Sequence, residues 1–276
     1  MRTWLITGAS RGFGTLIAQQ ALAAGDAVIA TARKPEDVVA RLGEHPNLLA
    51  VRLDVTREED AHQAVAEGIK RFGRIDVLIN NAGYGVLGAV EETSASETER
   101  LFATNVFGLL NVTRAVLPHM RRQRSGHVIN ISSLGGYQGY MGWGVYGSTK
   151  FAVEGISEAM HQELAPLGIN VTVVEPGFFR TDFLDEQSLI KTALELSDYD
   201  ETVGQMRKFA ASANHAQPGD PDKFAKAMLE LVNAANPPQR LPLGSDAVAR
   251  IASKHAFVEG ELVQWRELAM STDFAQ

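Results

Sequence analysis

The stretch Thr7-Gly8-Ala9-Ser10-Arg11-Gly12-Phe13-Gly14 follows a short apolar run at residues 4–6 and continues into an Ala-, Leu- and Gln-rich segment that ends at Gly25. A buried strand, a glycine-rich turn and a helix in this order can cradle phosphate groups. Glycine permits the sharp turn and a close approach to the main chain, and the helix N-terminus presents free N–H groups to an anion. The spacing Gly-x-x-x-Gly-x-Gly departs from the common dinucleotide fingerprint, and an ordinary strand-to-helix turn would account for the same residues. By itself, the stretch indicates a nucleotide site without establishing one.

Further short runs of aliphatic or β-branched residues recur along the chain. They lie at residues 27–30, 48–53, 75–79, 127–131, 169–174 and 240–243. Such runs are typical of strands buried on both faces, and helical segments lie between them. The alternation predicts an α/β fold, a Rossmann-type doubly wound parallel sheet of about seven strands with helices on both faces. Pro242 cannot donate a ladder hydrogen bond, so the last of these runs, if it forms a strand, is expected at a sheet edge or to place Pro242 at a strand end.

Three helix starts are marked by capping residues. Thr56-x-x-Glu59 and Ser94-x-x-Glu97 have the capping-box pattern, and Asp220 precedes a proline at the first helical position.

The chain shows no internal repeat or flexible linker, so residues 1–276 are interpreted as one domain, although the length would allow two. An irregular insertion follows the sixth strand. Residues 178–220, approximately, are expected to form a mobile substrate lid that bends at Gly204 and near residues 214–219. A C-terminal helical segment is expected at about residues 246–270.

The composition limits the possible partners. The chain has 26 Lys and Arg against 33 Asp and Glu, a formal net charge of -7, so neither nucleic acid nor a membrane surface is expected as a partner. No uncharged apolar run approaches the ~18 residues of a membrane span. Cysteine is absent, which excludes disulfides and thiolate sites, and the seven histidines show no ligand spacing, so no metal is expected. The pattern favours a cytoplasmic protein.

Further motifs follow the glycine-rich stretch in a fixed order. Asn80-Asn81-Ala82-Gly83 closes the fourth expected strand, Asn105 lies in the following helix, Ser133 ends the fifth strand, Tyr146-Gly147-Ser148-Thr149-Lys150 opens the next helix, and Pro176-Gly177 follows the sixth strand. With this ordered set, the chain resembles the short-chain dehydrogenase/reductase family, in its short single-domain branch. The resemblance covers about residues 1–182 motif by motif. It implies an enzyme that transfers a hydride between a nicotinamide cofactor and its substrate.

The same resemblance implies that Ser133, Tyr146, Lys150 and Asn105 form the catalytic group. Tyr146 would exchange a proton with the substrate oxygen, and Ser133 would hydrogen-bond that oxygen. Tyr146 and Lys150 are one helical turn apart, so both can project from one face. The Lys150 ammonium and the oxidised nicotinamide are expected to lower the pKa of Tyr146 below the ~10 of a free tyrosine. Asn105 would hold a water that connects Lys150 to solvent, unless it is only a packing residue.

The end of the second strand predicts which nicotinamide cofactor binds. An acidic residue here suits the ribose of NAD, whereas a 2'-phosphate requires positive charge. Ala32 occupies the position of the acid, Arg33 follows it, and Arg11 could close on the phosphate from the glycine loop. NADP(H) is therefore favoured, unless the two arginines are only solvated surface charges.

The resemblance also implies a wider set of cofactor-binding residues, with Asp54 and Val55 at the adenine and Asn81 on the side of the adenosine ribose. The set is Gly8, Ser10, Arg11, Gly12, Phe13, Gly14, Arg33, Asp54, Val55, Asn81, Ala82, Gly83, Tyr146, Lys150, Pro176, Gly177 and Thr181.

Mostly aromatic residues are expected to wall the substrate site, with Arg180 as the one basic residue among them. They are Leu134, Tyr137, Tyr140, Trp143, Phe178, Phe179 and Phe183. Such a wall suits a medium-sized hydrophobic ketone or secondary alcohol as the small-molecule substrate, although individual aromatics could instead be core or lid packing.

Three classes of function remain open. The first is an NADP(H)-dependent carbonyl reductase or alcohol dehydrogenase. The second is an epimerase or dehydratase of the same fold with a tightly bound cofactor, and the third is a non-catalytic NADP sensor that binds a partner protein. The presence of all four proton-transfer groups favours the first.

A homodimer or homotetramer is expected, because the resembled family often pairs the helices that here carry Asn105 and Tyr146. Phe107, Leu109 and Phe151 are the candidate exposed contacts. The apolar residues of the tail could instead cover that surface or another one. They are Val248, Ile251, Phe257, Leu262, Trp265 and Leu268.

Overall fold

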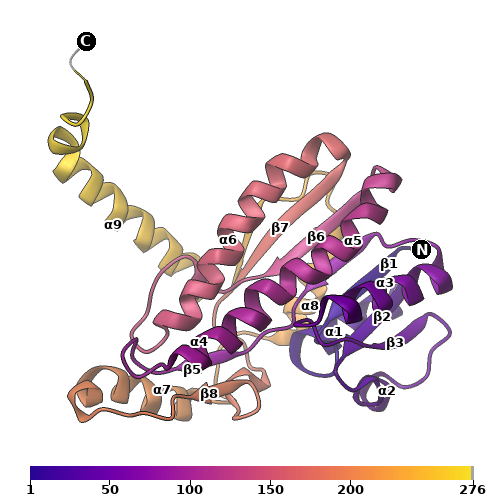
Figure 1. Cartoon of the computed structure of the whole chain (residues 1–276), viewed down its shortest axis with the longest axis horizontal. Coiled ribbons are helices and arrows are strands. Elements are labelled where there is room, and N and C mark those ends of the chain that lie inside the picture. Colours follow the sequence, from indigo (N-terminus) through magenta and orange to yellow (C-terminus); the bar gives the residue numbers. More distant parts are fainter. Residues whose placement is uncertain (275–276) are drawn as a thin grey trace.

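The computed structural model describes residues 1–274. Seven parallel strands form its central sheet, in the order β3-β2-β1-β4-β6-β7-β9 (Figure 1). The strands are β1 (Thr3–Thr7), β2 (Ala27–Ala32), β3 (Leu48–Arg52), β4 (Val77–Asn80), β6 (Gly126–Ile131), β7 (Ile169–Pro176) and β9 (Arg240–Leu243). The doubly wound α/β fold predicted from the sequence is confirmed, and β9 lies at the sheet edge, as Pro242 predicts.

Helices cover both faces of this sheet. They are α1 (Gly12–Ala23), α2 (Pro35–Leu42) and α8 (Pro221–Asn233) on one face, and α3 (Glu58–Phe72), α5 (Leu109–Gln123) and α6 (Gly144–Leu164) on the other. Alternate strand residues enter separate cores: Trp4 and Ile6 pack with α1 and α8, whereas Leu5 packs with α3 and α5. Because both faces are covered, the strands appear in the sequence as continuous apolar runs. The strand order reverses between β1 and β4, which places the expected ligand crevice at their carboxyl ends.

The helix starts follow two of the three predicted caps. Ser94 and Glu97 form a capping box at α4 (Ala95–Phe102), and Asp220 accepts hydrogen bonds from the backbone of α8. The prediction at Thr56 is wrong, because its hydroxyl donates to Asp54 at 2.7 Å and α3 begins only at Glu58. A local side-chain bond thus competes with the cap.

One long helix, Ala95–Gln123, consists of α4, a π-helical turn (Ala103–Gly108) and α5. It is long and apolar enough to cross a membrane, but half of its most apolar window is buried inside the fold, as in a core helix. Leu109 is buried in it, so the expectation that Leu109 is exposed is wrong. Phe107 and Phe151 are exposed as expected.

The insertion after β7 contains regular structure. Its strand β8 (Leu189–Lys191) pairs in parallel with β5 (Gly85–Leu87), and α7 (Gln205–Ala213) follows. The bend predicted at Gly204 is wrong, because this residue has helical backbone angles and joins a π-helical turn to α7.

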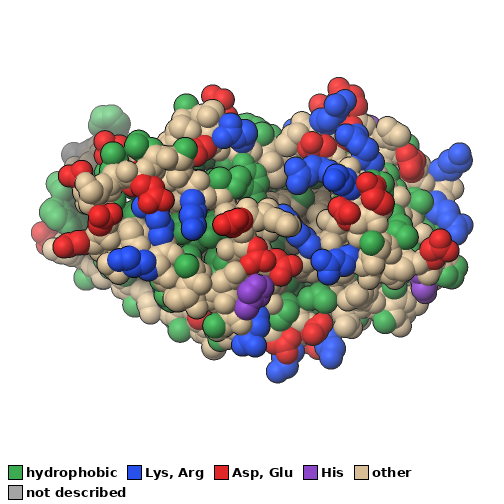
Figure 2. Space-filling view, turned by 90° about the horizontal axis from the view of Figure 1, so that it is seen from below, with side chains coloured by type: hydrophobic (Ala, Val, Ile, Leu, Met, Phe, Trp, Pro, Cys, Tyr) green, Lys and Arg blue, Asp and Glu red, His purple; other side chains and the backbone are tan. Residues whose placement is uncertain are grey.

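The last helix, α9 (Ser245–Met270), projects from the body of the molecule (Figure 1). Figure 2 shows hydrophobic side chains at the end of the molecule where this helix lies. Its exposed apolar residues include Val248, Phe257, Leu262, Trp265 and Leu268. The sequence left open that this tail covers Phe107 and Phe151. Both side chains are exposed in the structure, so the tail does not cover them within its own chain.

Candidate active site

One large cavity of about 1440 Å³ lies at the carboxyl ends of the strands. It extends from the loop after β1, past the ends of β2 and β3, to the insertion and the start of α9. All the expected cofactor-binding and catalytic residues line it except Gly14 and Asn105. The structure thus brings together residues that the sequence distributes over most of the chain.

The glycine loop leaves open space at the N-terminus of α1. Gly8 and Gly12 have φ angles of 66° and 54°, where glycine is favoured, and a Cβ on Gly12 would meet no atom within 4 Å. A Cβ on Gly14 would lie 2.4 Å from the carbonyl oxygen of Gly8, so Gly14 serves close packing behind the loop. Open backbone next to a helix N-terminus fits a pyrophosphate.

Two predicted cofactor residues also support this loop. The amide nitrogen of Asn81 donates to the carbonyls of Thr7 and Gly8 at 2.9 and 3.2 Å, so it braces the loop, and the expected contact of Asn81 with the adenosine ribose stays a prediction. The ring of Phe13 stacks on Phe224 in the core, with 3.7 Å between the centroids. Both residues still border the cavity.

Three exposed cations line the cavity near β2 and α2. Arg33 and Lys34 directly follow β2, and Arg41 lies on α2. Two carboxylates, Asp37 and Asp54, line the same region. Lys34 and Arg41 were not predicted from the sequence, although Lys34 directly follows Arg33 and Arg41 lies in the last turn of α2.

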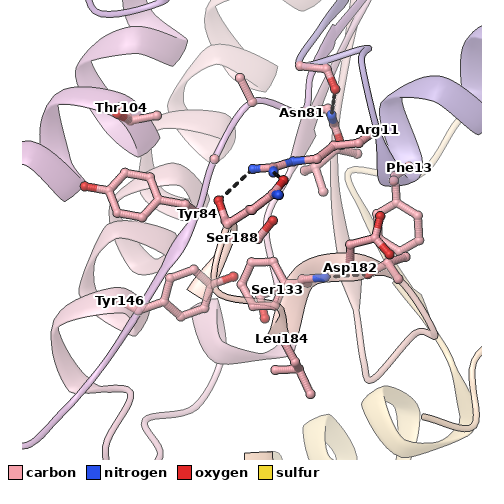
Figure 3. Close-up of a pocket in the computed structure, with 18 of the residues that line it drawn as sticks. Arg11, Phe13, Asn81, Tyr84, Thr104, Ser133, Tyr146, Asp182, Leu184 and Ser188 are labelled. Atoms are coloured by element: carbon pink, nitrogen blue, oxygen red, sulfur yellow. Dashed lines mark hydrogen bonds between the residues drawn. The ribbon is translucent and has the colours of Figure 1, made fainter. Parts of the chain in front are cut away.

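Arg11 is bound to the insertion. Its guanidinium donates to the Gln187 side chain at 3.0 Å and to the Gln187 carbonyl at 2.8 Å, so it connects the glycine loop to the lid segment (Figure 3). The expectation that Arg11 is directed at a phosphate is not met in this arrangement.

Tyr146 and Lys150 are buried on one face of α6 beside Ser133, which follows β6. The Lys150 ammonium lies 5.8 Å from the centroid of the Tyr146 ring and donates to the carbonyl of Ile131 at 2.9 Å. The Ser133 hydroxyl accepts the N–H of Gly135 at 3.0 Å. Figure 3 shows Tyr146 and Ser133 directed into the same space.

Burial shifts the pKa values of the two buried groups in opposite directions. It raises the pKa of Tyr146 to about 12, against the effect of the Ser133 hydroxyl. It lowers the pKa of Lys150 to about 8, against the effect of the Glu154 carboxylate. The value for Tyr146 applies to the protein's own groups. The expected pKa below 10 also includes the charge of a bound oxidised nicotinamide, and it stays a prediction. The phenol carries its proton at neutral pH, which suits a proton donor.

Asn105 lies in the π-helical turn of the long helix and is buried. Its side chain accepts the N–H of Tyr84 at 3.1 Å and donates to the Tyr84 carbonyl and the Thr149 hydroxyl at 3.0 and 3.1 Å. A Cβ on Gly83 would lie 3.2 Å from the Asn105 amide oxygen and 3.7 Å from the Lys150 nitrogen. Asn105 thus fixes the segment after β4 next to Lys150, and its role in holding a water stays a prediction.

Aromatic side chains surround Tyr146. The centroids of Trp143 and Phe183 lie 5.6 and 5.7 Å from that of Tyr146. Six predicted wall residues line the cavity, namely Leu134, Tyr140, Trp143, Phe178, Phe179 and Phe183.

Two other residues expected at this wall lie elsewhere. Tyr137 contacts His255 through its hydroxyl and lies beneath the guanidinium of Arg240, so it faces α9 and β9. Arg180 donates to the carbonyl of Gln217 at 3.2 and 3.3 Å and lines a separate, smaller pocket. Besides Arg41, the large cavity is lined by two further arginines that the sequence did not indicate, Arg100 and Arg250.

Asp182, Asp185 and His215 meet in the insertion, with one ligand-type atom of each within 4.8 Å of the others. Spacing could not indicate this group, because His215 comes from a separate segment. Within this group, Nε2 of His215 lies 3.3 Å from a carboxylate oxygen of Asp185.

Comparisons with known proteins agree with this geometry. A family model for short chain dehydrogenases matches residues 2–190. Oxidoreductase BOA17 of Botryotinia fuckeliana (strain B05.10) is 40% identical over 274 residues, which cover 98% of this chain and 99% of that protein. The 3-ketodihydrosphingosine reductase of Bacteroides thetaiotaomicron is 38% identical over 262 residues, covering 95% and 94%. A crystal structure of a short-chain dehydrogenase from Streptomyces avermitilis has a TM-score of 0.92 at 42% identity, covering 99% of this chain and 100% of that one.

Proposed function

Because the chain belongs to the short-chain dehydrogenase/reductase family, we propose that it is an NADP(H)-dependent oxidoreductase that interconverts a ketone and a secondary alcohol in a medium-sized hydrophobic compound. The observation that carries the proposal is the buried pair Tyr146 and Lys150, which borders the same cavity as Ser133 and the open glycine loop. A bound nicotinamide would supply the hydride chemistry there.

In the direction of reduction, Tyr146 donates its hydroxyl proton to the carbonyl oxygen of the substrate. The Ser133 hydroxyl oxygen accepts the N–H of Gly135, which leaves the hydroxyl proton available. Ser133 donates this proton in a second hydrogen bond to the substrate oxygen. The Lys150 ammonium stabilises the phenolate that remains. At neutral pH both Tyr146 and Lys150 carry the protons that this step requires, given their pKa values of about 12 and about 8.

A panel of ketones with NADPH, and of alcohols with NADP, tests the proposal. Turnover of hydrophobic ketones is expected. Failure across the panel would contradict it, and a nucleotide that survives purification would favour the epimerase or dehydratase alternative. A cytoplasmic location is part of the proposal and is tested by cell fractionation.

We expect Arg33→Asp to shift the cofactor preference from NADPH to NADH. Arg33 is exposed and lines the cavity at the end of β2, where it can form a charge-assisted bond to a 2'-phosphate. Losing that bond lowers NADPH affinity roughly 10- to 100-fold, while NADH affinity changes little. Fluorescence titration measures both affinities, with Lys226→Asp on the outer side of α8 as control. If the native protein turned over NADH as readily as NADPH, the assignment of NADP(H) would fail.

We also propose that the chain forms a homodimer or a homotetramer. A second copy would cover the exposed side chains of Phe107 and Phe151, or the exposed apolar side chains of the projecting helix α9. We expect sedimentation at micromolar concentration to show a particle at least twice the 29.9 kDa of one chain. Phe151→Glu and Trp265→Glu should weaken it, whereas Val39→Glu, at an exposed position of α2 on the other face of the sheet, should not. A native particle of single-chain mass would refute the assembly.

A further inference from the structure

We propose that the natural substrate carries a carboxylate in addition to the reacting carbonyl group, and that Arg250 of α9 binds this carboxylate. The inference rests on the proposed function and adds the substrate class of the same cavity.

Arg250 lines the cavity from the second turn of α9, with its guanidinium 5.3 Å from the centroid of the Tyr140 ring. Within residues 1–274 it has no carboxylate partner at ion-pair distance. Asp246, one turn earlier on the same helix, instead accepts the N–H of Phe178 at 2.8 Å. A guanidinium fork that borders a cavity and lacks an acidic partner is available to a carboxylate of a ligand.

Two further polar groups of the cavity wall lack partners. Gln217 is only 3% exposed, yet neither its amide oxygen nor its amide nitrogen has a hydrogen-bond partner in the described chain. The buried hydroxyl of Tyr140 also has none there. Arg250 approaches the oxygen of this hydroxyl closely enough to lower its pKa, although not in good hydrogen-bond geometry, and burial outweighs this effect and raises the pKa. The hydroxyl therefore keeps its proton and can donate. Buried polar groups without partners cost free energy, which a polar ligand group in the cavity would recover.

The surrounding wall is apolar, which limits the rest of the ligand. Phe178 and Phe209 pack edge to face at 5.9 Å, and Met206 lines the cavity with them. Arg250 supplies one positive charge, and the Asp246 carboxylate lies near enough to act on Tyr140. This wall can therefore match the single charge of a carboxylate, whereas a dianionic phosphate would require more positive charge than Arg250 provides. The ligand class is therefore an oxo acid with a hydrophobic body.

The test compares a hydrophobic ketone that ends in a carboxylate with its methyl ester, both reduced with NADPH. We expect the native protein to prefer the acid. Arg250→Gln should lower kcat/KM for the acid roughly 10- to 100-fold, mainly through KM, and should change that for the ester little. Lys254→Gln is the matched control, because Lys254 lies one turn further along α9, stacks on Phe257 and does not line the cavity. It should leave both substrates unaffected.

Gln217→Leu distinguishes a ligand role from a structural one. If the amide serves the ligand, leucine weakens use of the acid and at the same time raises Tm, because a buried unpaired polar group is removed. Calorimetric binding of a hydrophobic carboxylic acid without a ketone, in the presence of NADPH, provides a readout that does not depend on turnover. That binding should also be weaker in Arg250→Gln.

Equal kcat/KM for acid and ester in the native protein, unchanged by Arg250→Gln, would overturn this inference and leave the reductase proposal intact. Loss of the preference in Arg100→Gln but not in Arg250→Gln would overturn it as well. If no ketone is reduced, the reductase proposal fails, and calorimetry alone then decides whether the cavity holds a carboxylate at Arg250.

Discussion

Replacing Tyr146 by phenylalanine is expected to lower kcat at least ~100-fold, which is the usual contribution of a positioned acid or base. The substituted ring keeps its packing against Trp143 and Phe183, and only the proton-carrying hydroxyl is lost. Cofactor affinity should therefore stay close to that of the native protein. Steady-state kinetics in both directions and titration of NADPH fluorescence measure the two quantities.

Tyr137→Phe is the control for this substitution. It removes a hydroxyl from the same region of sequence, but that hydroxyl contacts His255 and lies outside the cavity. Turnover should be unchanged. Nearly native turnover in Tyr146→Phe would show that another group supplies the proton.

The second large effect concerns Lys150→Met and the pH dependence of both directions. Reduction uses the ammonium of Lys150, whose pKa burial lowers to about 8, so kcat for reduction should fall as the pH rises through about 8. Tyr146 keeps its proton over this range. In Lys150→Met the fall in kcat near pH 8 should disappear. Most of the activity should be lost as well, a decrease on the order of 100-fold.

Oxidation requires the phenolate and should increase with pH. Lys150→Met removes a nearby positive charge, so the midpoint of its oxidation profile should move upward from the native one. The measurement is kcat against pH at saturating cofactor, with Lys70→Met, at an exposed position on α3, as control. An unshifted oxidation midpoint would mean that Lys150 positions the cofactor without tuning Tyr146.

The sheet could be predicted from the sequence because its strands are buried on both faces and appear as uninterrupted apolar runs. The short pair β5 and β8 could not, because three-residue strands carry no periodicity. The prediction of a helix start at Thr56 was wrong for a local reason, because the Thr56 hydroxyl donates to Asp54 instead. The prediction of a bend at Gly204 was wrong because glycine is also tolerated within a helix.

The candidate site was predictable where its residues follow strands, since parallel strands bring their carboxyl ends to one edge. Tyr137 was misplaced because an aromatic residue near the site can face either the cavity or a neighbouring helix. Arg250 was missed because its helix reaches the cavity only through tertiary packing. The rise in the pKa of Tyr146 that burial causes could not be predicted, because the sequence shows a nearby lysine but not the degree of burial.

The edge strand β9 affects how copies of this chain can meet. The carbonyl of Gln239 accepts the N–H of Val173 in β7, and the carbonyl of Leu243 accepts the N–H of Gly177 directly after β7. Positions 239 and 243 therefore face β7, and Pro242 faces outward. An outward-facing proline offers no N–H to an approaching strand, and a four-residue edge offers little else. The sheet is therefore protected at this side from continuing into the sheet of a neighbour, a contact that would lead to open-ended aggregates rather than closed assemblies.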